Sequence, residues 1–105
     1  MEKRNHPRMS VLIPATIRCR GRLFPATALN VSCGGIYLEI EVESLTENTA
    51  VEVTFDLDNE NRDISLCGTI ARVENNTQPR VGVQFGSQFS QSHKVLREFL
   101  RRNFN

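Results

Sequence analysis

The chain has 105 residues, a length that corresponds to one domain. Lysine and arginine number 13 and aspartate and glutamate 12, so the net charge of +1 argues against a general nucleic-acid or membrane-surface binder, which normally carries a basic excess. The three cysteines (Cys19, Cys33 and Cys67) form no C-x-x-C pair, and no apolar run reaches signal-peptide or transmembrane length. We therefore expect one cytoplasmic domain with free, partly buried cysteines, no metal site and no membrane insertion.

The order of polar and apolar residues predicts a β-rich chain. Residues 1–9 are polar and basic, and we expect an arm that is mobile when nothing is bound. Period-2 alternation predicts strands at residues 11–20, 36–42, 51–57, 64–73 and 81–85. Residues 23–29 predict a further strand whose faces the pattern leaves unassigned. Pro14 indicates a sheet edge or a bulge, and Gly68 a bend or a bulge.

The end of the chain changes to helical spacing. Val95, Leu96, Phe99 and Leu100 recur on one face, and Ser90 or Ser92 is the expected N-cap. Six antiparallel strands followed by one helix predict a mainly β fold. We expect the strands to close into a barrel, because closure removes exposed sheet edges. We expect the barrel at residues 10–86 and a helix at 90–103, which packs against the barrel's mouth or its side.

Two short polar stretches stand out from this pattern. Arg4 and Arg8 lie four residues apart in the basic arm, and Asn30, Ser32 and Gly35 form an N-x-S-x-x-G sequence between two apolar runs. Taken singly, the first is typical of a solvated basic tail and the second of a turn between strands. Their order, and a separation of about twenty residues, favour a shared role.

Together the two stretches resemble the two-part signature of the PilZ family, R-x-x-x-R followed by [D/N]-x-S-x-x-G. The resemblance covers nearly the whole chain. It implies a six-stranded antiparallel barrel with a C-terminal helix, and a bacterial receptor for the second messenger cyclic di-GMP. It also implies that the arm wraps the ligand over a floor formed by the second motif. The candidate ligand-binding residues are Arg4, Arg8, Asn30, Ser32 and Gly35, with their neighbours Lys3, Cys33 and Gly34 as further candidates.

These residue types suit a cyclic dinucleotide. An arginine fork delivers two parallel N–H donors, which match a phosphate or the O6 and N7 acceptors of guanine. Two arginines four apart span about 13 Å of extended chain, enough to hold different parts of one ligand. Asn30 is expected to read a guanine edge, Ser32 to bond a phosphate or the backbone, and Gly35 to keep the floor clear. Lys3 adds a cation that a pair of intercalated ligands would need.

The sequence leaves other functions open and weakens some of them. A single-stranded nucleic-acid binder on an OB-like barrel needs aromatic residues interleaved on a basic face, yet Tyr37 is the only tyrosine and tryptophan is absent. A PilZ-like module that binds only protein would not need the intact motif residues. Neither a G-x-S-x-G context nor a phosphate-binding G-x-x-x-x-G-K-[ST] occurs, so we expect no catalytic residue and no cofactor. The expected output is an arm that orders on ligand binding and signals to an unidentified effector protein.

Overall fold

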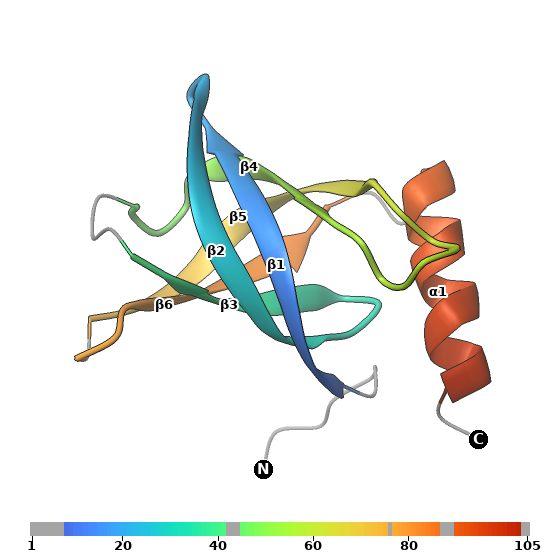
Figure 1. The fold of residues 1–105 in the computed structure, drawn as a ribbon. Coiled ribbons are helices and arrows are strands. Elements are labelled where there is room, and N and C mark those ends of the chain that lie inside the picture. Colours follow the sequence, from blue (N-terminus) through green and yellow to red (C-terminus); the bar gives the residue numbers. More distant parts are fainter. Residues whose placement is uncertain (1–7, 42–44, 76, 87–89, 104–105) are drawn as a thin grey trace, which may run out of the picture.

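The computed structural model describes residues 8–41, 45–75, 77–86 and 90–103, and these form a closed antiparallel barrel with one helix (Figure 1). The barrel order is β1-β2-β3-β6-β5-β4. The elements are β1 (Met9–Cys19), β2 (Arg22–Val31), β3 (Gly35–Ile40), β4 (Ala50–Phe55), β5 (Ile64–Glu74), β6 (Arg80–Phe85) and α1 (Gln91–Asn103). The predicted mainly β fold, a six-stranded barrel followed by a helix, is confirmed. Residues 1–7 of the expected arm, and Val42, lie outside the described residues.

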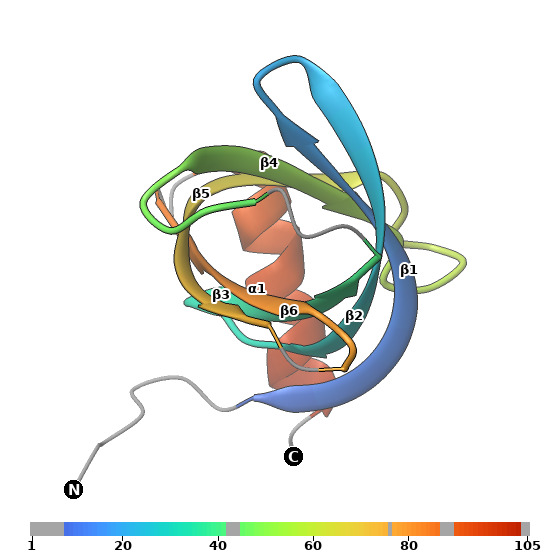
Figure 2. The same ribbon diagram turned by 90° about the vertical axis from the view of Figure 1, so that its left-hand side faces the viewer.

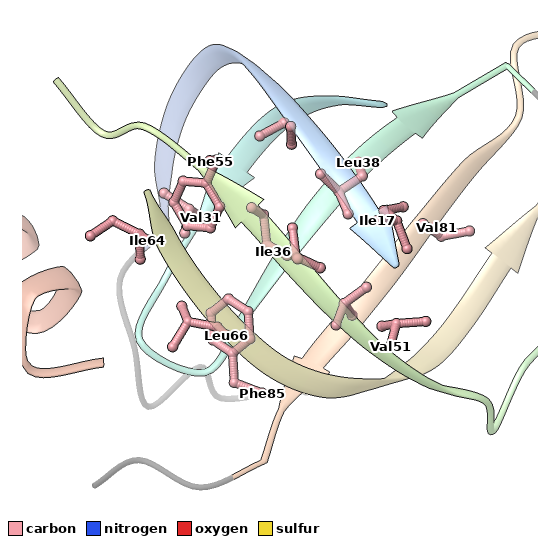
Figure 3. Packing of buried hydrophobic residues seen from close by; sticks show 14 of the residues in the cluster. Ile17, Val31, Ile36, Leu38, Val51, Phe55, Ile64, Leu66, Val81 and Phe85 are labelled. Carbon is pink, nitrogen blue, oxygen red and sulfur yellow. The ribbon is translucent and has the colours of Figure 1, made fainter. Parts of the chain in front are cut away.

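The core is built from the alternate residues that the period-2 pattern selects. Ile17, Leu38, Val53 and Val81, from four different strands, are completely buried. Figure 3 shows Ile17, Leu38 and Val81 meeting inside the barrel with other apolar side chains. Because successive strand residues point to opposite faces, each inward residue leaves an outward neighbour available for surface chemistry.

The β2 strand carries the irregularity that the sequence pattern could not assign. Its register with β3 shifts between Ala28, which pairs with Leu38, and Asn30, which pairs with Tyr37. Ala28 and Val31 are therefore both buried although they are three residues apart. An extra residue of this kind turns the following side chains to the other face, so Asn30 joins the outer surface and Val31 the core.

Pro14 and Gly68 were the two residues expected at irregularities of the sheet, and a register shift lies next to Pro14 but not at Gly68. The β1–β2 register shifts between Ser10 and Ile13, directly before Pro14, as the proline indicated. Gly68 does not form a bulge, because the β5–β6 register shifts later, between Ile70 and Arg72. Gly68 is needed for another reason: a Cβ atom there would lie 2.4 Å from the carbonyl oxygen of Gln84 on β6.

The helix α1 lies across one mouth of the barrel, as the two views together show (Figures 1 and 2). Its inward face consists of buried side chains from His93, Leu96, Phe99 and Leu100. The Ser90 hydroxyl accepts the backbone N–H of His93 at 3.1 Å, which identifies Ser90 as the N-cap. The helix was expected at the mouth or the side of the barrel, and the structure places it at the mouth. The turn between β2 and β3 reaches the barrel end that faces α1 (Figure 1).

Candidate functional site

The two signature stretches meet on the outer surface of the barrel. Arg8 stands directly before β1, and its Nη1 donates a hydrogen bond of 2.7 Å to the Asn30 Oδ1. Arg8 is exposed and Asn30 is half-buried, and Asn30 faces outward because of the β2 bulge. The structure thus joins two of the predicted ligand-binding residues, although 22 positions separate them. Lys3 and Arg4 lie outside the described residues.

Ser32 lies inside the turn that follows β2. Its side chain is almost fully buried, at 3% exposure, and its Oγ accepts the backbone N–H groups of Gly34 at 3.1 Å and Gly35 at 3.2 Å. The Ser32 backbone N–H donates to the Gly35 carbonyl at 2.9 Å. Of the two roles expected for this hydroxyl, a phosphate contact or a backbone contact, the described conformation has the backbone contact. Ser32 therefore fixes the shape of the turn.

Gly35 begins β3 in a position without room for a side chain. It is buried, and a Cβ atom there would lie 2.4 Å from the carbonyl oxygen of Val83 on β6. Real Cβ contacts do not approach this closely, so the neighbouring strand by itself requires glycine at this point. The sequence assigned Gly35 to a floor kept clear for a ligand, and the structure adds a reason that needs no ligand.

Cys33 and Gly34 fill the middle of the turn, and both are held by their carbonyl groups. The Gly34 carbonyl accepts the backbone N–H of Phe85 on β6 at 2.9 Å. The Cys33 carbonyl oxygen lies 2.6 Å from Nε2 of His93 on α1. Burial raises the pKa of the Cys33 thiol, while the positive charge of Arg97 on α1 opposes that rise. The helix therefore contacts the turn that carries the second motif.

His93 is a residue to which the sequence analysis assigned no role. Its side chain is completely buried. A signal for this was present, because His93, Leu96 and Leu100 stand at the spacing of one helix face. A polar ring on an apolar face needs a buried partner, and here that partner is the Cys33 carbonyl.

A tyrosine ring lies beside Asn30 on the outer surface. Tyr37 on β3 pairs with Asn30, and its next neighbour across the sheet is Gly82 on β6, which pairs in turn with Arg72 on β5. The Arg72 guanidinium carbon is 5.7 Å from the centre of the Tyr37 ring, and that of Arg80 is 6.0 Å away. These distances are typical of cation–π contacts.

Two carboxylates balance the charge of these two guanidinium groups. Arg72 pairs with Glu74 at 3.1 Å and Arg80 with Glu39 at 3.4 Å, and the Tyr37 hydroxyl donates to Glu74. The sequence analysis missed the grouping because the four charged residues come from three strands that only the barrel register brings together. The result is a surface of guanidinium groups and one aromatic ring next to Arg8 and Asn30. Such a surface suits an anion that also carries flat rings.

Two other kinds of feature are absent from the described part of the chain. The described residues include no group of three or more histidine, cysteine, aspartate or glutamate side chains placed to hold a metal ion. None of the described helices is both long and apolar enough to cross a membrane.

Comparisons with known proteins identify structures with the same fold. The structure is similar to the Bacillus subtilis inhibitor of motility MotI/DgrA, with a TM-score of 0.82 and 17% identity over 100% of this chain and 53% of that one. It is also similar to the PilZ domain of Escherichia coli YcgR with c-di-GMP, with a TM-score of 0.79 and 11% identity over 96% and 91%. The Klebsiella pneumoniae MrkH–c-di-GMP complex gives a TM-score of 0.79 and 13% identity over 98% and 52%.

This chain therefore spans about half the length of MotI/DgrA and MrkH. A search of curated protein sequences finds no match. At these low identities the structural similarities show the fold, and the family itself rests on the sequence profile. The PilZ domain profile matches residues 2–102, which is nearly the whole chain, and the protein belongs to the PilZ domain family.

Proposed function

We propose that this protein is a receptor for cyclic di-GMP, which it binds on the outer surface around Arg8 and Asn30. The observation that carries the proposal is the hydrogen bond of 2.7 Å from Arg8 Nη1 to Asn30 Oδ1, which joins both halves of the signature on an accessible surface. Two of the structural neighbours, YcgR and MrkH, are described in complex with this ligand. No described residue is assigned a catalytic role, and the function is binding alone.

The bond between Arg8 and Asn30 prepares both side chains for the ligand. With its Oδ1 accepting from Arg8, the Asn30 amide presents N–H donors, which match the O6 and N7 acceptors of a guanine edge. The planar guanidinium group of Arg8 has the geometry that suits a phosphate oxygen. A residue already held in its binding geometry loses less conformational entropy when the ligand arrives.

The neighbouring surface supplies further guanidinium groups, each paired with a carboxylate. Arg72 and Arg80 stand over Tyr37, and Tyr37 pairs with Asn30 across the β2–β3 register. Two phosphates of one ligand carry about two negative charges, to which these guanidinium groups offer hydrogen-bond donors. A guanidinium plane also offers a surface for stacking against a base.

The basic arm completes the proposed site. Arg4 provides the second arginine fork of the signature, and Lys3 stands beside it as a further cation. Wrapping of residues 1–8 over the ligand would change the surface around Asn30, and we propose that an effector protein reads that change. A segment that orders on binding makes its new surface depend on the ligand, which is the requirement for a switch.

Calorimetric titration with cyclic di-GMP tests the proposal, with GTP as the control nucleotide. We expect saturable binding of cyclic di-GMP and none of GTP. Hydrogen exchange of the backbone in residues 1–8 tests the arm, because Met9 already belongs to β1. We expect slower exchange in the complex, with the remote hairpin turn at Arg20 and Gly21 unchanged. Absence of binding, or equal binding of GTP, would refute the receptor function. Binding without protection of residues 1–8 would refute only the ordering of the arm.

A further inference from the structure

The buried imidazole of His93 connects the C-terminal helix to the signature turn. Its Nε2 lies 2.6 Å from the Cys33 carbonyl oxygen, 60 positions away in the chain. A carbonyl oxygen only accepts hydrogen bonds, so the ring must carry its proton on Nε2. The ring is completely shielded from solvent, where a hydrogen bond is stronger than at the surface.

His93 supplies a contact that the barrel does not. In the turn, the Gly34 carbonyl is bound by Phe85 of β6, and the Gly35 carbonyl by Ser32 of the turn itself. The Cys33 carbonyl is bound by the helix. The His93 ring also stands edge-on to Phe85, with ring centres 6.3 Å apart and an interplanar angle of 87°. One side chain of α1 thus touches both Cys33 and the residue that anchors Gly34.

The other ring nitrogen shows that this histidine is not there for packing alone. Nδ1 of His93 is the buried side-chain nitrogen that has no hydrogen-bond partner among the described residues. A buried polar atom without a partner is unfavourable, and leucine at this position of the apolar face would avoid it. The benefit that offsets this cost is the bond from Nε2 to the signature turn.

We propose that His93 is a positioning residue for the ligand site. By holding the Cys33 carbonyl, it fixes the turn from Ser32 to Gly35, which follows Asn30 and Val31 at the end of β2, and it makes ligand affinity depend on the docking of α1. By thermodynamic linkage, a ligand that favours this turn also strengthens the docking of α1 by the same factor. The inference rests on the proposed function, and it gives the signal a second route, through the helix.

Three variants separate the hydrogen bond from packing. His93→Leu removes the N–H donor and replaces the ring with an apolar side chain of comparable size. His93→Gln restores an N–H donor near the position of Nε2. Leu96→Ala, at an equally buried position of the same helix, weakens helix packing without removing a polar atom. Calorimetry with cyclic di-GMP is performed at a temperature where all four proteins are folded, as checked by circular dichroism.

We expect His93→Leu to bind cyclic di-GMP about tenfold more weakly, because a buried carbonyl loses its donor. His93→Gln should recover most of the affinity, and Leu96→Ala should lower the midpoint of thermal unfolding more than it lowers affinity. Nitrogen-15 spectra of the wild type should show the histidine proton on Nε2. Wild-type affinity in His93→Leu, or equal losses in His93→Leu and Leu96→Ala, would overturn the inference.

If the wild type fails to bind cyclic di-GMP, the proposed function falls, and the same variants still test the role of His93. The readout is then hydrogen exchange of the Gly34 and Gly35 amides, which donate to Ser32 Oγ. Faster exchange in His93→Leu than in Leu96→Ala supports the positioning role. Equal exchange in the two variants overturns it.

Discussion

The signature residues divide into an exposed pair and a buried pair, although the sequence pattern does not distinguish them. Arg8 and Asn30 meet on the outer surface, with the Arg8 guanidinium bonded to the Asn30 amide. Ser32 and Gly35 lie inside. The Ser32 hydroxyl accepts two backbone N–H groups, and Gly35 lies where the β6 backbone leaves no room for a Cβ atom. The exposed pair carries the donors that the proposed site offers to a ligand, and the buried pair fixes the turn that follows β2.

This difference teaches that equal membership of a motif does not mean equal roles. Substitution of a buried member should act on the stability of the fold, and only through it on binding. Substitution of an exposed member should act on binding and leave the stability of the barrel unchanged. The comparison is therefore tested by measuring both quantities for each variant.

The largest effect is expected for Gly35. In Gly35→Ala, and more severely in Gly35→Val, the new Cβ atom meets the Val83 carbonyl oxygen, and we expect a loss of about 3 kcal/mol or more in the free energy of unfolding. Urea denaturation measures it. Gly82→Ala is the matched control, because a Cβ atom there has nothing closer than the Arg72 Cβ at 3.9 Å. Equal stability of Gly35→Ala and Gly82→Ala would contradict the steric argument.

Arg8→Ala should abolish most of the binding of cyclic di-GMP and leave the urea midpoint unchanged. Charge-assisted hydrogen bonds to a ligand are each worth about 1.5–3 kcal/mol, so we expect a loss in affinity of about tenfold to a hundredfold by calorimetry. Arg8→Lys should also bind poorly, since a lysine cannot reproduce the planar fork. Arg18→Ala, on β1 at a distance from the signature, is the control. Near-wild-type affinity in Arg8→Ala would remove this residue from the site.

Ser32→Ala should show the opposite balance of effects. The Gly34 and Gly35 amides lose their common acceptor, and we expect the free energy of unfolding to fall by about 1–3 kcal/mol. Ligand affinity should fall less than in Arg8→Ala. Urea denaturation and calorimetry on the same preparation compare the two effects. A wild-type urea midpoint together with a large loss of affinity would place Ser32 with the exposed pair.

The smallest effect concerns the thiol in the signature turn. Burial raises the pKa of Cys33, so at mildly alkaline pH less of it is the reactive thiolate. We expect iodoacetamide to modify Cys33 more slowly than the exposed Cys67, and the Cys33 rate to keep rising with pH beyond the usual thiol range. Mass spectrometry of digested protein measures both rates. Faster modification of Cys33 than of Cys67 would show that the turn is open in solution.

Most of the fold followed from local pattern. The alternation from Ile36 to Ile40 and from Val51 to Phe55 specified two strands and their buried faces, because side chains alternate across a strand. The apolar spacing after Ser90 specified the helix and its inward face. The signature residues pointed to the family, and the family profile bears that out.

Tertiary structure decided what the local pattern could not. The bulge in β2 turns Asn30 to the outer surface, where it bonds to Arg8, and the barrel register places Tyr37 between Asn30 and the arginines of β5 and β6. The contact of His93 with Cys33 depends on the docking of α1 across the barrel mouth. A sequence expresses each residue's preference for a strand, a turn or a helix. Which distant residues share a surface is set by strand register and helix docking, and those depend on the packing of the whole core at once.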